Sequence, residues 1–577
     1  MEKVNAISNL LPDDSRRHVQ IEQRLNGDEP TTLIDPRAPL KFGDPATVEQ
    51  WLIEMSKGNY GGPEFKNNAE LLEAVSSVPV THVALLRFLV KVAAGRLHVA
   101  DQSERKHKWL VWNGRIYDTY NQKFTNTITT CLADVLELLY EDYLKRTEGL
   151  RADKESAKMA VTLLKPIEAL VSDLRKSSGL FGFAKVMLGD ATLSYDEDAH
   201  EADDLGYVVE ADGRLRHVDN LDVIADPDPS LFITRTLNVC TTDTWEDNGE
   251  WSQFLLETFG VADGAGGFIR DEEKETLLRQ AAGVALIGTG QAKAFIHILG
   301  TSNSGKSFYL DALARVFGDF GHPLSSSAII KLNGVNFQQD EARGVRFLFL
   351  SEPDTSALDG PFVKTLTGGS NERITTSRKG LSGITWSPRC LFHVVSNEPL
   401  KFNASEKALN KRILTISADN SVEETDPRFD PHRVDKIISK DIETIYRWAL
   451  QGAKEFIANG GRLDIPEEVR RMQKEREDTS NSAVKWLNDK IEERAIVRDP
   501  SIKAASNMYK WNKSDYLDYD HWCTVQGLKP YSDEKVRSLI NTYMGAPSGK
   551  NMDVKKDGYY RLWGLAPGEG ASAARSL

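Results

Sequence analysis

The fold is decided by the stretch Gly300-Thr301-Ser302-Asn303-Ser304-Gly305-Lys306-Ser307, a complete G-x-x-x-x-G-K-S phosphate loop. Residues 294–299 (AFIHIL) are typical of a short buried strand, and residues 308–317 (FYLDALARVF) have helical spacing. A strand, a glycine turn and a helix start direct backbone N–H groups and the helix dipole at phosphate oxygens. The pattern predicts a nucleotide site, with Lys306 on the β- and γ-phosphates and Ser307 on Mg²⁺. The alternative is a glycine turn without a ligand.

Two further apolar runs predict strands that end in polar residues. Residues 345–350 (VRFLFL) are typical of a buried parallel strand, and Glu352 and Asp354 follow it. We prefer Glu352 because it is nearer the strand end, where a carboxylate holds the Mg²⁺ water shell or polarises the attacking water. The strand predicted over residues 390–395 (CLFHVV) is followed by Asn397, an amide suited to the γ-phosphate. The alternative is an ordinary polar turn after each strand.

A basic pair precedes another predicted strand. Lys411 and Arg412 stand just before Ile413, so the Arg412 guanidinium could reach the γ-phosphate of a neighbouring subunit. The alternative is a surface arginine in a salt bridge.

Composition excludes several classes of protein. The chain of 577 residues carries a formal net charge of −13, which argues against nonspecific coating of nucleic acid but not against a locally basic channel. No run approaches the roughly 18 apolar residues of a membrane span, and the first residues lack the apolar core of a signal peptide. The four cysteines are far apart, which excludes a disulfide framework and a local zinc cluster. We therefore expect a cytoplasmic protein.

The first half of the chain carries little recognisable chemistry. Helices are predicted over residues 44–58, 68–76 and 81–95, and an Asn-Gly turn within residues 108–117 predicts a β-hairpin. A long helical region follows over residues 127–190. The acidic stretch 196–204 lacks the ligand spacing of a calcium loop and is interpreted as a solvated face.

This order of motifs resembles the superfamily 3 helicases, in the branch of phage and plasmid primase-helicases and poxvirus-type enzymes, over about residues 95–565. On that resemblance the phosphate loop is Walker A, Glu352 is the Walker B acid, Asn397 is the sensor asparagine and Arg412 is the arginine finger. Lys364 matches the lysine ahead of a Thr-Gly-Gly-Asp element, in which this chain has Ser370 in place of the acid.

The resemblance also implies an architecture. It is an α/β fold with an AAA+-like P-loop NTPase core around a parallel sheet, preceded by a mainly helical N-terminal and collar region and followed by a C-terminal winged helix. Relatives often carry their own primase, for which residues 1–95 are too short, so a separate primase or polymerase is an expected partner. The expected segments are 1–95 (helical, role unknown), 96–285 (helical collar with a small β-hairpin), 286–420 (ATPase core), 421–482 (helical extension and linker), 483–565 (winged helix) and 566–577 (disordered tail).

DNA contacts are expected in two places. The segment 374–386 predicts a hairpin with Arg378 and Lys379 at its tip, which the resemblance places in a ring channel; the alternative is a solvated loop. In the winged-helix candidate, the basic residues that would contact phosphates on a helix and a wing are Lys535, Arg537, Lys550, Lys555 and Lys556.

Together these patterns predict an ATP- and Mg²⁺-dependent replicative DNA helicase of a phage or mobile element, acting in a bacterial cytoplasm. It would form a hexameric ring that translocates on single-stranded DNA and unwinds forked DNA. The alternatives are a DNA-binding replication initiator whose ATPase is an assembly switch, and an AAA+ protein remodeller.

Overall fold

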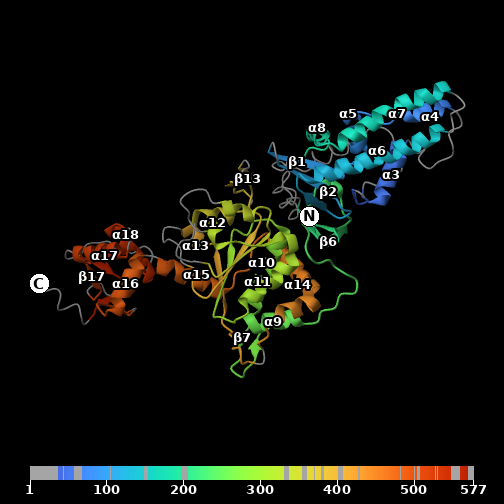
Figure 1. The fold of residues 1–577 in the computed structure, drawn as a ribbon. Coiled ribbons are helices and arrows are strands. Elements are labelled where there is room, and N and C mark those ends of the chain that lie inside the picture. Colours follow the sequence, from blue (N-terminus) through green and yellow to red (C-terminus); the bar gives the residue numbers. More distant parts are fainter. Residues whose placement is uncertain are drawn as a thin grey trace.

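The structure is a computed structural model, and its ribbon runs from a helical region through a central sheet to a small C-terminal region (Figure 1). The residues that it describes are 37–42, 44–56, 68–103, 106–148, 154–195, 206–329, 337–353, 360–369, 371–377, 383–400, 407–426, 429–480, 482–499, 501–502, 507–526, 528, 530–546 and 559–568.

The first region combines helices with a three-stranded antiparallel sheet of order β1-β2-β3. Its elements are α3 (Pro45–Met55), α4 (Asn68–Ser76), α5 (His82–Ala93), β1 (Leu97–Ser103), β2 (Lys106–Trp112), β3 (Tyr117–Tyr120), α6 (Phe124–Glu148), α7 (Lys154–Leu174) and α8 (Ser177–Leu188). The predicted hairpin is confirmed, because β2 pairs with β3 from Trp112 opposite Tyr117.

One hydrophobic core joins this region from Leu40 to Leu193, so the domain boundary predicted at residues 95 and 96 is wrong. Leu85, Leu89 and Val92 on α5 are buried in the same core as Trp109 of β2. The boundary was placed where the pattern changes from helix to strand, but a change of element does not divide a shared core.

A second antiparallel sheet belongs to the central region. It consists of β4 (Tyr207–Val209), β5 (Leu215–His217) and β6 (Asn220–Ala225), followed by the short helix η1 (Pro229–Leu231). The fully buried Glu210 carboxylate accepts hydrogen bonds from Arg216 Nε at 2.6 Å and from the Tyr446 hydroxyl at 2.9 Å. Val208 and Leu215 of this sheet belong to the same core as Tyr446, which lies far along the chain, and not to the core of the first region. The predicted segment 96–285 is therefore divided between two cores.

The central sheet contains five parallel strands in the order β10-β11-β14-β9-β15. Their near-continuous apolar sequences fit a sheet that is covered on both faces. This confirms the predicted α/β class with a parallel sheet. The strands are β9 (Phe295–Gly300), β10 (Gly321–Pro323), β11 (Phe347–Ser351), β14 (Leu391–Ser396) and β15 (Ile413–Ala418).

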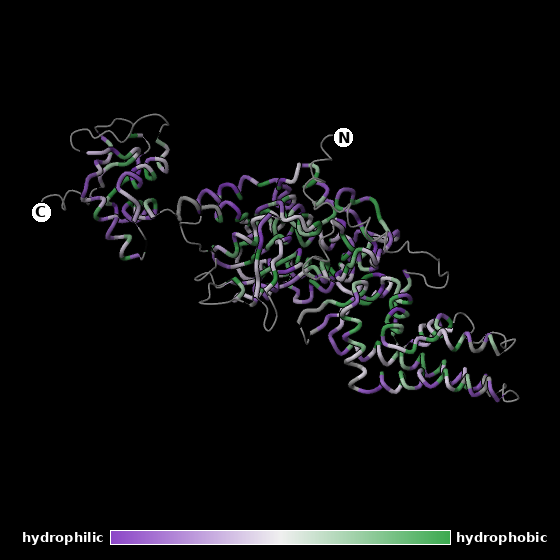
Figure 2. Tube along the Cα trace, turned by 90° about the horizontal axis from the view of Figure 1, so that it is seen from above, coloured by the Kyte–Doolittle hydropathy of each residue, from purple (hydrophilic) through white to green (hydrophobic). Residues whose placement is uncertain are grey.

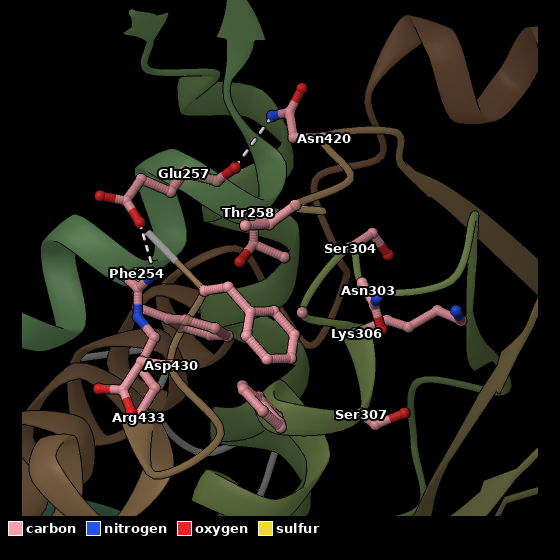
Figure 3. A pocket seen from close by; sticks show the side chains of 14 residues that line it. Phe254, Glu257, Thr258, Asn303, Ser304, Lys306, Ser307, Asn420, Asp430 and Arg433 are labelled. Carbon is pink, nitrogen blue, oxygen red and sulfur yellow. Dashed lines mark hydrogen bonds and ion pairs between the residues drawn. The ribbon is translucent and has the colours of Figure 1, made fainter. Parts of the chain in front are cut away.

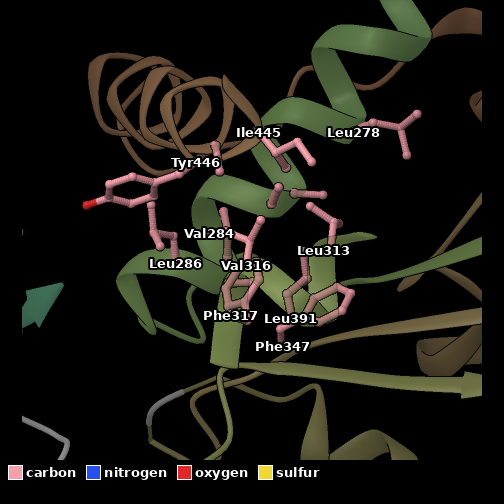
Figure 4. Close-up of a cluster of buried hydrophobic side chains, with 14 of the residues drawn as sticks. Leu278, Val284, Leu286, Leu313, Val316, Phe317, Phe347, Leu391, Ile445 and Tyr446 are labelled. Carbon is pink, nitrogen blue, oxygen red and sulfur yellow. The ribbon is translucent and has the colours of Figure 1, made fainter. Parts of the chain in front are cut away.

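Helices pack on one face of the sheet and bury its largest core (Figure 4). They are α9 (Glu250–Phe259), α10 (Glu272–Ile287), α11 (Lys306–Phe317) with η2 (Gly318–Phe320), and α14 (Arg433–Ala458). The ends of α10 have clear causes: Asp271 caps its start by accepting from Lys274 N, and Gly288 ends it with φ 61°. An added Cβ on Gly283 would lie 2.1 Å from Ala453 N, so α10 and α14 cross in close contact.

The extensive burial of α14 corrects a second expected boundary. Ile445, Ala449 and Ala453 on α14 belong to the same core as the sheet. The predicted segment 421–482 is therefore not only an extension and linker, because α14 packs in the core that covers one face of the sheet.

The opposite face of the sheet carries shorter elements over a smaller core. Ala328 and Ile329, in the short helix that follows Ser325, are buried because they close this core. The remaining elements of the central region are β7 (Val261–Ala262), β8 (Phe268–Ile269), η3 (Ser326–Ile329), η4 (Phe337–Ala342), α12 (Gly360–Leu366), β12 (Ile374–Thr376), β13 (Ile384–Trp386), α13 (Lys407–Asn410) and α15 (Glu467–Ser480).

The C-terminal region has its own core, built around Trp486 and Trp511, whose rings meet edge to face. Strand β19 extends to Pro567, two residues beyond the predicted end of this domain, because it pairs with β16; residues 569–577 of the expected tail lie outside the described residues. Its elements are α16 (Ser482–Glu492), β16 (Ile496–Arg498), β17 (Tyr509–Trp511), α17 (Lys513–Val525), α18 (Asp533–Tyr543), β18 (Tyr560–Leu562) and β19 (Leu565–Pro567). Apolar residues (green) gather inside the central region, and hydrophilic residues (purple) lie along its outer helices (Figure 2).

Candidate functional site

The phosphate-loop sequence connects the central strand β9 to the helix α11, as the sequence predicts. Asn303 and Gly305 have positive φ angles of 60° and 86°, which turn the loop so that α11 begins at Lys306. A Cβ on Gly305 would lie 2.7 Å from Thr258 Oγ1, so the loop also approaches α9 too closely for another residue type. The N-terminus of α11 therefore opens at the carboxyl end of the sheet.

Three residues predicted for the site meet at this end of the sheet. Lys306 Nζ donates to Asn397 Oδ1 at 2.7 Å and to Thr301 O at 2.9 Å, and lies 3.9 Å from Glu352 Oε1. They come together because β11, β14 and β9 are neighbours in a parallel sheet, so their carboxyl ends share one edge. A cation, an amide and a carboxylate in this arrangement can bind a phosphate and orient a water molecule beside it.

Burial affects the Lys306 ammonium more than its carboxylate neighbour does. Lys306 is 4% exposed, and this burial lowers the pKa of its ammonium, while the Glu352 carboxylate opposes the shift. The Glu352 side chain is 50% exposed, so water screens its attraction for the lysine. The cation therefore depends on Asn397 and the Thr301 carbonyl, and an anion entering here would gain a partner that is already partly desolvated.

Glu352 has an unusual backbone conformation. Its φ is 50°, a left-handed value that is costly for a side chain with a Cβ, and its N–H donates to Val395 O at 2.9 Å. That hydrogen bond fixes the turn after β11 against β14. Asp354, the alternative carboxylate, lies outside the described residues.

A magnesium site is compatible with the residues at this edge. Ser307, the second residue of α11, is exposed and Glu352 is half-exposed, so a hydroxyl and a carboxylate oxygen can both face a bound phosphate. Within the described ranges there is no cluster of three or more metal-ligating His, Cys, Asp or Glu side chains. The acidic stretch 196–204, which we predicted to be a solvated face, lies outside the described residues.

Arg412 lies at the opposite end of the sheet from Lys306. Its carbonyl accepts from the N–H of Phe295, the first residue of β9, whereas the phosphate loop follows the last. Its guanidinium donates to Lys364 O and to Thr367 Oγ1. Arg412 is thus not part of the cluster formed by Lys306, Glu352 and Asn397 in its own chain.

The residues predicted to contact DNA have different outcomes. The hairpin over residues 374–386 is confirmed, because β12 pairs antiparallel with β13. Lys535 is exposed on α18. The basic residues that lie outside the described ranges are Arg378, Lys379, Lys550, Lys555 and Lys556.

Arg537 is a correction to the predicted DNA-binding set. The residue is 4% exposed, forms an ion pair with Asp533 one turn earlier, and holds its guanidinium carbon 3.5 Å from the centre of the Tyr560 ring. These contacts join α18 to β18, so Arg537 lies in the domain interior and not on a phosphate-contacting surface. The basic pattern of the helix did not distinguish its two faces.

Sequence reasoning missed a pocket beside the phosphate loop (Figure 3). The rings of Phe254, Phe308 and Phe429 line it. Two other lining residues form an ion pair, with Arg433 Nη1 2.6 Å from Glu257 Oε2. These residues come from α9, α11 and the segment leading into α14. No local pattern links such distant parts of the chain, so the sequence offered no signal for the pocket.

The segment after β15 fastens the phosphate loop to this pocket. Val422 N donates to Asn303 O at 3.1 Å, and Ser421 Oγ donates to Ser302 O at 2.8 Å. Asn420 Nδ2 donates to the carbonyls of Glu257 and Gly260 at 3.1 and 2.7 Å. The loop is therefore held through its backbone carbonyls at Ser302 and Asn303.

Comparisons with known proteins give few matches. No protein-family model and no curated protein matches the sequence. Among solved structures, the apo NrS-1 C-terminal region in its A form is similar with a TM-score of 0.43 and 13% identity, over 84% of this chain and 98% of that one. A second apo structure of that region, residues 305–718, gives a TM-score of 0.41 and 12% identity over 84% and 99%. Similarity at this level identifies neither a family nor an activity.

In the described part of the chain, none of the helices combines the length and the apolar character needed to cross a bilayer.

Proposed function

We propose that this protein is an ATP hydrolase whose catalytic centre lies at the carboxyl end of the central sheet. The observation that carries the proposal is the convergence of Lys306, Asn397 and Glu352 from three different strand ends, with Lys306 Nζ 2.7 Å from Asn397 Oδ1 and 3.9 Å from Glu352 Oε1. The described residues offer a buried cation for the phosphates, an amide beside it and an acid exposed to water. That combination fits phosphoryl transfer to water.

The residues have separate tasks in this proposal. The backbone N–H groups of the loop and Lys306 hold the β- and γ-phosphates, and Asn397 contacts the γ-phosphate or orients the attacking water. Glu352 polarises that water by accepting its proton. Mg²⁺, held through Ser307 and Glu352, would neutralise charge on the phosphate oxygens. We assign the nucleoside to the pocket lined by Phe254, Phe308 and Phe429, because the same pocket is lined by residues of the phosphate loop.

The finer proposal is a replicative DNA helicase of a phage or mobile element, working as a hexameric ring in a bacterial cytoplasm beside a separate primase or polymerase. Two features support it. Arg412 directly precedes β15, the edge strand beside β9, at the amino end of the sheet, where it could serve a neighbouring subunit. In the sequence Arg378 and Lys379 stand between the paired strands β12 and β13, and their charges would suit DNA phosphates.

Two alternatives remain from the sequence: a replication initiator whose ATPase switches its assembly, and a protein remodeller. Both use the same hydrolytic site, so the site alone does not separate them. The C-terminal core with exposed Lys535 on α18 and the basic segment 550–556 favours a protein that contacts DNA.

The deciding experiment is strand displacement on forked DNA by the purified protein, with and without ATP, together with ATP hydrolysis measured with and without single-stranded DNA. A helicase displaces the strand only with ATP and hydrolyses ATP faster with DNA. DNA-stimulated hydrolysis without displacement would identify the switch. Hydrolysis that ignores DNA would favour the remodeller, and no hydrolysis under any of these conditions would refute the proposed activity.

A further inference from the structure

A line of polar side chains crosses the buried sheet beside the candidate site. His297 of β9 is 1% exposed and lies between Thr415 of β15 and Ser396 of β14, which are 2% and 3% exposed. Its Nδ1 is 3.2 Å from Thr415 Oγ1, and its Nε2 is 2.8 Å from Ser396 Oγ. Burying three polar groups in the middle of an apolar sheet is unfavourable unless each is hydrogen-bonded. The three residues satisfy one another across three strands.

The hydrogen bonds run in a single direction. Arg476 of α15 donates to Thr415 Oγ1, since a guanidinium has no acceptor, so the Thr415 hydroxyl keeps its proton available for His297 Nδ1. At the other end Ser396 Oγ donates to Glu398 O at 2.5 Å. Ser396 must therefore accept from His297, which places the ring proton on Nε2.

The surroundings keep this ring neutral. Burial, reinforced by the nearby Arg476 charge, lowers the pKa of His297 to about 3. At neutral pH the imidazole therefore has one donor and one acceptor, and both are used. A charged ring would have two donors, and its Nδ1–H would point at a hydroxyl whose own proton already points back.

The chain of hydrogen bonds ends around Asn397. Ser396 and Glu398 flank Asn397, so the hydroxyl-to-carbonyl bond between them closes the turn that carries it. Asn397 is exposed at a strand end, where an amide would otherwise sample several rotamers. In the structure its Oδ1 meets Lys306 Nζ at 2.7 Å. The buried relay thus fixes the backbone from which a candidate phosphate-binding group projects.

We propose that His297 is a positioning residue, whose neutral imidazole holds the turn of Ser396 and Glu398 so that Asn397 is aimed at Lys306 and the γ-phosphate. This inference rests on the proposed ATP hydrolysis. Because Arg476 belongs to α15, which precedes the C-terminal core, the same relay gives that helix a bonded path to the nucleotide site.

The test compares two buried histidines of the same sheet. His297→Leu removes both bonds of the relay, whereas His393→Leu is the matched control. His393 of β14 is fully buried, its Nδ1 lies 3.3 Å from Leu391 O, and its Nε2 has no partner among the described residues. We expect His297→Leu to lower kcat for ATP by about 10-fold or more with KM within about twofold, as for other residues that orient a reacting group. The control should keep kcat within about twofold.

Milder variants keep the test decisive if His297→Leu does not fold. Ser396→Ala deletes only the hydroxyl and should produce the same loss in kcat without a change in KM. His297→Gln keeps a donor toward Ser396 and should recover most of the rate. Full kcat in Ser396→Ala, or a rise in KM alone, would overturn the positioning role.

A second readout separates this inference from the proposed function. If the wild-type protein does not hydrolyse ATP, the proposed function fails, and the relay is then read from the imidazole ¹⁵N spectrum of histidine-labelled protein. The relay predicts a neutral His297 ring with its proton on Nε2 from pH 7 to pH 5. A charged ring or a proton on Nδ1 would show that the directional relay does not exist.

Discussion

The two ends of the central sheet hold their cations in different surroundings. At the carboxyl end Lys306 lies among side chains from neighbouring strands, with Asn397 and Glu352 beside it. At the amino end Arg412 donates to the backbone carbonyl of Lys364 and to Thr367 Oγ1. β9 separates them, and six residues of strand span about 20 Å. Within one chain, Arg412 is therefore too distant to act on a phosphate held by Lys306.

This difference teaches that the two cations cannot serve one nucleotide in the same subunit. Lys306 is buried, and phosphate oxygens could replace Asn397 and the Thr301 carbonyl as acceptors of its hydrogen bonds. Arg412 is held by one carbonyl and one hydroxyl, and a guanidinium has five N–H donors, so its capacity is not exhausted by these two acceptors. If Arg412 takes part in hydrolysis, it does so on a partner's nucleotide.

The largest expected effect tests the carboxyl end. Lys306→Ala should reduce ATP hydrolysis to background, at least about 100-fold, because the only buried cation in the described cluster is lost. The measurement is phosphate release by the purified protein. The control is Lys158→Ala, which removes an exposed lysine from α7 in the first region of the chain. Near wild-type hydrolysis by a folded Lys306→Ala protein would break the comparison at its stronger end.

The next effect tests the amino end. Arginine fingers contribute about 10³–10⁵ in rate in other phosphoryl-transfer enzymes, so Arg412→Ala should be severely impaired alone. Mixed with Lys306→Ala it should recover part of the hydrolysis, since some interfaces then pair an intact loop with an intact finger. The measurement is rate against mixing ratio after subunit exchange has been verified. Absence of recovery at every ratio would remove Arg412 from this role, with Lys411 and Arg389 the next residues to test.

Much of the carboxyl end could be predicted because its signals are local. The strand β9 and the helix α11 on either side of the phosphate-loop sequence, and the apolar runs of β11 and β14, all have short-range patterns that the structure confirms. The proximity of Lys306, Glu352 and Asn397 follows from parallel strands sharing an edge. Their catalytic roles stay predictions.

What could not be predicted depends on contacts between distant segments. The pairing of Glu257 with Arg433 joins α9 to α14, and the bond from Arg476 to Thr415 joins α15 to the sheet. The division of cores failed for the same reason, since α14 follows the last strand yet packs on α10. Arg537 was misjudged because its basic charge is satisfied by Asp533 and Tyr560, and Tyr560 lies on another element.

Helix α18 offers a similar contrast, because Arg537 is buried in its own domain and Lys535 is exposed to solvent. Smaller effects are expected from substituting these two residues. Lys535→Ala should leave stability unchanged and weaken DNA binding, reducing the salt dependence of log K by about one unit of slope. Arg537→Ala should instead destabilise the C-terminal core by about 1–3 kcal/mol, because it removes a buried side chain together with its ion pair and ring contact. Binding titrations at several salt concentrations and thermal melting separate the two. If Arg537→Ala weakens binding at unchanged stability, Arg537 contacts DNA and does not support the core.

The smallest expected effect compares the two faces of the sheet through their buried histidines. Burial lowers the pKa of His297 to about 3, with Arg476 contributing, and that of His393 to about 4, against an ordinary value near 6.5. Between about pH 6.5 and pH 4 the unfolded chain therefore binds protons that the folded chain excludes, so stability is complete above pH 6.5 and falls as the pH decreases. At pH 5 each histidine should account for up to about 2 kcal/mol of this loss. We expect the thermal midpoint of wild type to fall between pH 7.5 and pH 5, and to fall less in His297→Gln and in His393→Gln. Comparing each variant with wild type at equal ionic strength cancels the contribution of the carboxylates. A fall of the same size in His297→Gln as in wild type would mean that the folded ring binds protons as readily as the unfolded one, which contradicts its place in the relay.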